Sequence, residues 1–172
     1  MIEIAALLVF PLLMAFAASS DLLTMTISNR VSLALFAGFI AMGLALGLPW
    51  DVMLMQLSCG LVVLAIGFGL FCFGWIGGGD AKLAAATAVW MGWSRLLDYG
   101  LTASVFGGIL TLAILQVRRW PLPLWANATP WIARLHDKAT GVPYGIALAC
   151  AGLIIYPDTI VWLATIGARV NG

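Results

Sequence analysis

The sequence predicts an all-α membrane protein with about six transmembrane helices, and three observations support this prediction. The 172 residues are 63% hydrophobic and 9% charged, whereas soluble domains average about 25% charged residues. A helix needs about 20 apolar residues to cross a bilayer, and apolar stretches close to that length recur along the chain. Their connections are short. We therefore expect one integral-membrane domain over residues 1–172, with no separate soluble unit.

The expected crossings, in order, are residues 3–20, 31–48, 53–75, 81–94, 99–117 and 142–166. The first is unlike a signal peptide, because its start carries Glu3 and no Lys or Arg. The fourth is short, with Lys82 as its charged residue. The last contains Pro157, so it either ends near Tyr156 or continues as a kinked helix. The longest polar connection is residues 118–141.

The distribution of positive charge predicts the orientation. Alternating the sides along six crossings places one group of basic residues together: Arg30, Lys82, Arg118, Arg119, Arg134 and Lys138. Arg95 and Arg169 fall on the other side. Because cytoplasmic loops carry an excess of Lys and Arg, we expect the first side to be cytoplasmic. Asp21 and Asp80 fall on that side as well, although their positions were not used in the assignment.

Several function classes find no support in the composition. A net charge of +1 provides no basic tract for nucleic acid. Cys59, Cys72 and Cys150 form no CxxC pair, so neither a zinc site nor a disulfide framework is predicted. His136, the single histidine, lies in a charged loop and is expected to be solvated. The eight tryptophans are expected to anchor the protein at the membrane interfaces, with Trp120, Trp125 and Trp131 around the 118–141 loop.

Two carboxylates are the candidate catalytic residues. Asp80 follows Gly77, Gly78 and Gly79 between two apolar stretches, and Asp21 follows the first apolar stretch. An ionisable residue at membrane depth indicates a functional site by default. Two carboxylates in close proximity cannot both ionise easily and share a proton. One can then take a proton from water while the other donates to a scissile carbonyl, which is the chemistry of peptide hydrolysis.

Other functions fit the same residues. A small proton- or cation-coupled transporter can use paired intramembrane aspartates, and a Gly-rich break can belong to a discontinuous helix. Transport sites favour the bilayer midplane and an inverted repeat, whereas both aspartates here are expected at the cytoplasmic edge. A scaffold protein would tolerate neutral replacement of either aspartate.

Three segments resemble the motifs of the type IV prepilin peptidases. Residues 21–30, Asp-Leu-Leu-Thr-Met-Thr-Ile-Ser-Asn-Arg, resemble the first aspartate motif, with Ile27 and Asn29 six and eight positions after Asp21. Residues 77–83, Gly-Gly-Gly-Asp-Ala-Lys-Leu, resemble the GxGD signature and include Lys82. The third segment, residues 142–147, is similar to the Pro-Tyr-Gly sequence that opens the last helix. Together these motifs extend the resemblance over essentially the whole chain.

The resemblance implies an aspartyl endopeptidase of the bacterial inner membrane, with Asp21 and Asp80 as catalytic residues. Its expected substrate is a prepilin or pseudopilin, an apolar helix preceded by a short basic leader that is cut after a glycine at the cytoplasmic side. No metal or organic cofactor is implied. The N-terminal insert with zinc-binding cysteines, associated with methylation in larger members, is missing. The chain therefore resembles the short, peptidase-only branch, similar to those that serve Flp or tight-adherence pili.

The remaining candidate site residues can each be interpreted in two ways. Gly77, Gly78 and Gly79 either let an extended substrate approach by strand addition or form a tight turn or helix contact. Lys82 either tunes the acidic site or places its charge at the interface. Asn29 either contacts substrate or caps the second helix. The segment Pro143-Tyr144-Gly145 sets the start of the last helix, and the resemblance adds a role in shaping the site.

Overall fold

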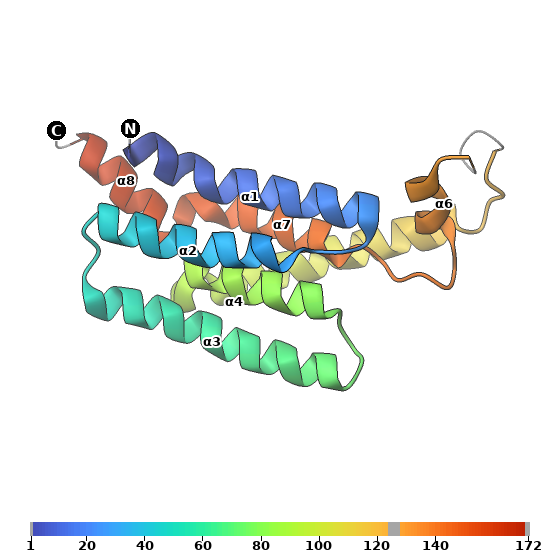
Figure 1. Cartoon of the computed structure of the whole chain (residues 1–172), viewed down its shortest axis with the longest axis horizontal. Coiled ribbons are helices and arrows are strands. Elements are labelled where there is room, and N and C mark those ends of the chain that lie inside the picture. Colours follow the sequence, from blue (N-terminus) through green and yellow to red (C-terminus); the bar gives the residue numbers. More distant parts are fainter. Residues whose placement is uncertain (1, 124–127, 171–172) are drawn as a thin grey trace.

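The structure is a bundle of α-helices. The computed structural model describes residues 2–123 and 128–170, and this part of the chain contains no strand. The helices are α1 (Ile2–Thr24), α2 (Asn29–Ala45), α3 (Trp50–Cys72), α4 (Gly78–Val117), α6 (Pro130–His136), α7 (Tyr144–Ile155) and α8 (Ile160–Val170), with a 3-10 turn η1 (Tyr156–Asp158) before α8. They run along one long axis, and α1 begins at the end where α8 finishes (Figure 1). The predicted all-α class is confirmed.

Four apolar stretches among the described residues are long enough to cross a membrane. They are Ile4–Thr24, Trp50–Cys72, Gly78–Val117 and Tyr144–Gly167. The last stretch shows that the chain continues through the 3-10 turn at Pro157 into α8. α2 is also apolar but has 17 residues, and α4 contains a reversal. The count of about six crossings therefore stays a prediction.

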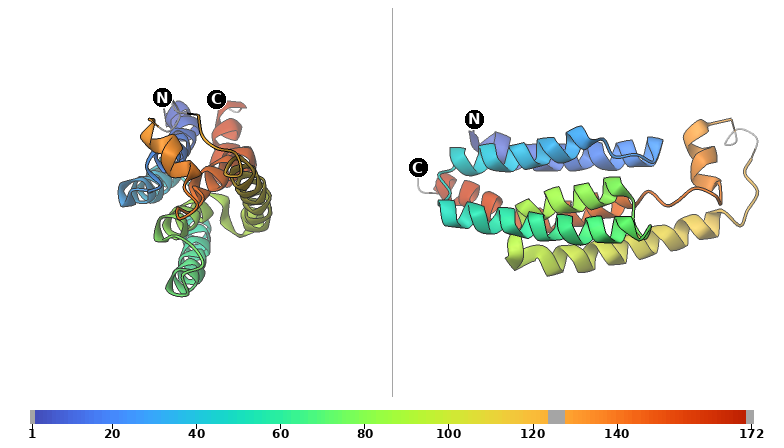
Figure 2. Two further views of the ribbon diagram at one scale, coloured as in Figure 1. Left: turned by 90° about the vertical axis from the view of Figure 1, so that its right-hand side faces the viewer. Right: turned by 60° about the horizontal axis from the view of Figure 1, so that its bottom comes forward.

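The reversal in α4 lies at Gly92, near the boundary expected between the fourth and fifth crossings. Gly92 has φ 64° and ψ 178°, a backbone conformation that is essentially restricted to glycine. The inner arm (residues 78–91) and the outer arm (residues 93–117) run in opposite directions in all side views of the bundle (Figures 1 and 2). Most inner-arm residues after Asp80 are buried. The inner arm is therefore the central element against which the other helices pack.

Replacing Gly92 with Ala is expected to lower the free energy of unfolding by about 2 kcal/mol or more. The substitution forces an L residue into the glycine conformation, and its Cβ would lie 1.6 Å from Oε1 of the buried Gln56. Thermal unfolding in detergent measures the effect. Gly100→Ala is the matched control on the outer arm, because nothing lies within 4 Å of a Cβ there. Equal melting temperatures for the two variants would contradict the assigned role of Gly92.

A cluster of aromatic rings fills the core at the end of the inner arm. Phe10 of α1 stacks on Tyr156 with ring centroids 4.5 Å apart, and its centroid lies 5.1 Å from that of Trp90. Phe39 of α2 meets the edge of the same indole. Nε1 of Trp90 donates a hydrogen bond of 2.9 Å to the carbonyl of Leu35. These contacts tie α1, α2 and the last helices to the inner arm.

Burial of Trp90 corrects one sequence prediction. Trp90 was expected among the interfacial anchors, but its side chain is completely buried. The sequence could not separate it from the others, because a tryptophan near the end of an apolar stretch suits either environment. Trp120 is exposed beside the end of α4, as expected, and Trp125 lies outside the described residues.

The basic residues gather at one end of the bundle. Arg30 and Lys82 lie in the first turns of α2 and α4, Arg118 follows the last residue of α4, and Arg134 belongs to α6. These helix ends all lie toward the end of the bundle opposite the beginning of α1, and α6 and the end of α4 extend beyond the starts of α2 and α4 (Figure 1). Arg95 follows the reversal and forms an ion pair of 3.4 Å with Asp98. The predicted grouping of charge is thus present in the fold, and the cytoplasmic assignment of this end stays a prediction.

Candidate active site

Asp21 lies near the C-terminal end of α1, where it contacts the start of α7. Its side chain is 4% exposed, and Oδ2 accepts a hydrogen bond of 2.7 Å from the backbone N–H of Gly145. Gly145 is the second residue of α7. The first N–H groups of a helix have no partner within the helix, and the N-terminus favours negative charge. Asp21 therefore fixes the start of α7 while its carboxylate remains at the site.

Gly145 is required by this contact. A Cβ at position 145 would lie 2.7 Å from Oδ2 of Asp21 and 2.7 Å from Cδ1 of Ile27. Neither approach leaves room for a side chain. The glycine of the Pro-Tyr-Gly segment is thus explained by the close packing of three segments: the end of α1, the turn after it and the start of α7.

Asp80 lies in the first turn of α4, after the N-cap Gly77. Its carboxylate rests against the backbone of the glycine run, since a Cβ on Gly77 would lie 2.9 Å from Oδ2. Gly78 faces the ring of Phe71 in α3, and Gly79 faces Ile27, where a Cβ would approach to 3.2 Å in each case. Each glycine therefore has a neighbour within the protein. Gly79 and Gly145 hold the same residue, Ile27, from two sides.

One cavity brings the two aspartates together. It has a volume of about 510 Å³ and lies at the basic end of the bundle. Its lining residues come from the end of α1, the turn after it, the start of α4 and the segment before α7: Asp21, Met25, Thr26, Ile27, Asn29, Gly77, Gly78, Gly79, Asp80, Lys82, Gly141 and Val142. The cavity is large enough to admit a stretch of polypeptide beside both carboxylates.

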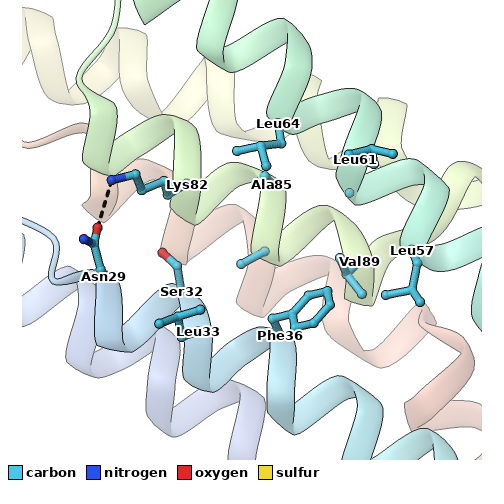
Figure 3. Close-up of a pocket in the computed structure, with 12 residues that line it drawn as sticks. Asn29, Ser32, Leu33, Phe36, Leu57, Leu61, Leu64, Lys82, Ala85 and Val89 are labelled. Carbon is cyan, nitrogen blue, oxygen red and sulfur yellow. Dashed lines mark hydrogen bonds between the residues drawn. The ribbon is translucent and has the colours of Figure 1, made fainter.

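Lys82 and Asn29 form a bridge between α4 and α2 at the rim of this cavity. Nζ of Lys82 donates a hydrogen bond of 2.9 Å to Oδ1 of Asn29 (Figure 3). Within the described residues the ammonium forms no ion pair with either aspartate. The cap of α2 is Ser28, whose Oγ accepts from the N–H of Arg30 at 3.3 Å. The alternative that Asn29 caps α2 is therefore wrong.

The turn after α1 contributes residues that sequence reasoning did not select. Met25 has φ 55°, a left-handed conformation that is uncommon for residues other than glycine. Its N–H donates a hydrogen bond of 2.8 Å to the carbonyl of Asp21. The sharp turn is followed by Ile27, which lies next to Gly79 of α4 and Gly145 of α7. Gly141 and Val142 were also missed as lining residues, although they directly precede the selected Pro143. A position beside a motif is the only signal the sequence offered.

Pro143 and Tyr144 lie outside the cavity, at the start of α7. Pro143 is buried and occupies the N-cap position of α7. The ring of Tyr144 packs on Gly107 of the outer arm, where a Cβ would lie 2.1 Å from Oη. Neither residue lines the cavity that holds the aspartates. Both fix the start of α7, and through it the N–H of Gly145.

The polar connection after α4 folds back onto the bundle. Arg118 is buried and donates from Nε to the carbonyl of Leu135 and from Nη2 to that of Gly141, both at 2.9 Å. Nη1 of Arg134 donates to the carbonyl of Leu23 at the end of α1, also at 2.9 Å. Two arginines therefore hold the segment before α7 against the site.

His136 lies in the same connection and differs from its prediction. It was expected to be solvated, but Nδ1 is buried and has no hydrogen-bond partner among the described residues. The imidazole lines a small apolar cavity with Ile114 and Leu135. The folding of α6 onto the end of α4 explains the difference, because a loop rich in charge gave no sign of this packing.

Replacing Arg118 with Lys is expected to loosen the connection without changing its charge. Lysine lacks the planar guanidinium that donates to both carbonyl oxygens at once. Each hydrogen bond made by a charged group contributes about 1.5–3 kcal/mol to stability. Protease cleavage within residues 118–141 is expected to accelerate about tenfold. Arg119→Lys, at an exposed neighbouring position, serves as control. Equal cleavage rates of the two variants would show that Arg118 does not anchor this segment.

These features define an all-helical membrane protein that places two carboxylates in one cavity at the end of its bundle. The profile of the type IV leader peptidase family matches residues 8–112, and the chain belongs to that family. A type IV leader peptidase activity is the function that this match supports. The matched range includes both aspartates, whereas the connection and α7 follow it. No curated protein and no solved structure matches the chain.

Proposed function

We propose that the chain is an aspartyl endopeptidase that removes the short basic leader from Flp-like type IV prepilins. Cleavage takes place at the cytoplasmic face of the bacterial inner membrane, with Asp21 and Asp80 as the catalytic pair. The observation that carries the proposal is that these two aspartates, from different helices, line one cavity at the basic end of the bundle. The family match supports the leader-peptidase activity itself.

The reaction needs only groups that the cavity provides together with water. One carboxylate takes a proton from a water molecule, and the other, in its protonated form, donates to the carbonyl oxygen of the scissile bond. The water oxygen attacks the carbonyl carbon and gives a tetrahedral gem-diol. Transfer of the proton taken from water to the leaving nitrogen then breaks the C–N bond, and one hydroxyl of the gem-diol returns its proton to the other carboxylate. The N–H of Gly145 holds Asp21 in a fixed orientation. Such positioning matters because proton transfer requires contact at hydrogen-bond distance.

The location of the cavity suits a substrate that is partly embedded in the bilayer. Asp21 lies near the end of one apolar stretch and Asp80 near the start of another, so both lie close to one boundary of the membrane-spanning region. In a prepilin whose apolar helix spans the membrane, the peptide bond that precedes the helix lies at the same depth as the two aspartates. Its basic leader then lies on the aqueous side, next to the acidic cavity.

Co-expression in a bacterial membrane with tagged Flp-like prepilins tests the proposal. Leader removal is followed by gel shift, and mass spectrometry identifies the new N-terminus. We expect one cut, on the N-terminal side of the apolar helix. Failure to cleave any of several prepilins, with both proteins present in the membrane, would contradict the proposed substrate. Proton uptake by vesicles containing the protein would then test the transporter alternative.

A further inference from the structure

A second cavity continues from the site between α2 and α3. Its volume is about 430 Å³, and we call it the α2–α3 slot. α2 and α3 each pack on α4, and the inner arm forms the floor between them (Figure 3). The lining residues are Asn29, Ser32, Leu33, Phe36, Leu57, Gly60, Leu61, Leu64, Lys82, Ala85, Ala86 and Val89.

The lining of the slot is apolar over most of its length. Small residues of the inner arm, Ala85 and Ala86, lie on the floor, so another helix can approach the backbone of α4 closely. The walls carry large side chains whose apolar surface is not covered by the protein: Leu33 and Phe36 from α2, and Leu61 and Leu64 from α3. This distribution suits an apolar helix lying lengthwise between α2 and α3.

The slot is continuous with the catalytic cavity. Asn29 and Lys82 line both, and their hydrogen bond crosses from α2 to α4 at the boundary. A polypeptide held beside Asp21 and Asp80 therefore reaches the slot by passing this pair. The apolar part of a substrate lies directly beyond its scissile bond, so the arrangement of the two cavities matches the order of the substrate's parts.

Ser32 supplies an independent indication that the slot receives a ligand. Its Oγ is buried and has no hydrogen-bond partner among the described residues. Two other helical serines satisfy this group within their own helix, since Ser19 donates to the carbonyl of Ala15 and Ser104 to that of Gly100. Ser32 instead lies in the slot wall near Lys82 (Figure 3). A buried hydroxyl without a partner is unfavourable, and rotation of the Ser32 side chain toward the slot would let a polar group on a bound helix satisfy it.

We propose that the α2–α3 slot binds the transmembrane helix of the prepilin during cleavage. This inference rests on the proposed function, because it takes its occupant from the proposed substrate. The helix packs on the floor of the inner arm, and its N-terminal end passes Asn29 and Lys82 into the catalytic cavity. The slot thereby sets which peptide bond reaches the aspartates.

Photo-cross-linking from the slot wall tests the binding of this helix. A benzophenone amino acid replaces Leu61, which is 67% exposed in the slot wall, or Leu112, which is 70% exposed on the outer arm. Both are placed in the Asp80→Asn background, so that the prepilin stays uncut. We expect cross-linking to prepilin at position 61 to exceed that at position 112 about tenfold. Equal yields, a cross-link to a second copy of this chain, or adducts to lipid alone would overturn the inference.

Narrowing the slot gives a second measurement with active enzyme. Leu61→Trp adds volume to an exposed wall residue without entering the core, and it is expected to slow prepilin cleavage about tenfold through misplacement of the substrate. Leu112→Trp is the matched control and should cleave at the wild-type rate. Unchanged cleavage by Leu61→Trp would count against the slot. Absence of cleavage by the wild-type protein would instead count against the proposed function, so the two failures are distinguishable.

Discussion

Asp21→Asn and Asp80→Asn are each expected to reduce leader removal by at least about 100-fold, because positioned acid–base groups typically contribute 10²–10⁴-fold to rate. The amide of Asn cannot exchange the proton that the reaction requires. Removal of either member should give a similar loss, since the proposed mechanism uses the two carboxylates as one unit. The measurement is the cleavage rate of a co-expressed prepilin at matched enzyme levels.

The structure allows a loss of catalysis in these variants to be distinguished from a folding defect. In Asp21→Asn the amide oxygen can still accept the hydrogen bond from the N–H of Gly145, so α7 keeps its attachment to α1. Asp51→Asn is the matched control, because Asp51 is an exposed residue in the first turn of α3. It should leave cleavage unchanged. More than about one-tenth of the wild-type rate in either test variant would contradict a catalytic dyad.

The sequence predicted the helical bundle well because hydropathy and helix length are local properties. Apolar stretches expected at 31–48 and 53–75 correspond to α2 (Asn29–Ala45) and α3 (Trp50–Cys72). The boundaries differ by about three residues for identifiable reasons. Ser28 caps α2 and Pro49 precedes α3, and the turn between these helices contains Gly47 with φ 67°.

The contacts that build the site could not be predicted in the same way. Three motif segments named the residues, but the hydrogen bond from Gly145 to Asp21 joins segments far apart in the chain. The pairing of Lys82 with Asn29 likewise depends on how α2 lies beside α4. Neither contact leaves a periodic signal in the sequence. Gly92 was missed for a different reason, since a glycine in an apolar helix usually marks close packing and here marks a reversal.

The role of Ile27 shows how a motif position acquires a physical meaning. The resemblance marked Ile27 by its distance from Asp21, with no indication of what the side chain does. In the structure it lies between Gly79 of α4 and Gly145 of α7. One aliphatic side chain and two glycines therefore set the spacing between the start of α4, which carries Asp80, and the start of α7, which binds Asp21. A change at either glycine should displace a carboxylate without removing it.

Gly145→Ala is expected to reduce leader removal about 100-fold while both aspartates remain, because displacement of a catalytic group by about 1 Å can cost that much. The new Cβ would lie 2.7 Å from Oδ2 of Asp21 and from Cδ1 of Ile27. Relief of these contacts requires movement of the carboxylate or of α7. The backbone hydrogen bond that orients Asp21 would be lengthened or lost in either case.

Gly141→Ala is a matched control for this variant. Gly141 also lines the cavity, but nothing lies within 4 Å of a Cβ at that position. Both variants add one methyl group to the segment before or at the start of α7, so only the contact with Asp21 and Ile27 distinguishes them. We expect Gly141→Ala to cleave prepilin within about twofold of the wild-type rate, since the catalytic geometry is unchanged. If both variants were equally active, the N–H of Gly145 would not be what positions Asp21 for catalysis.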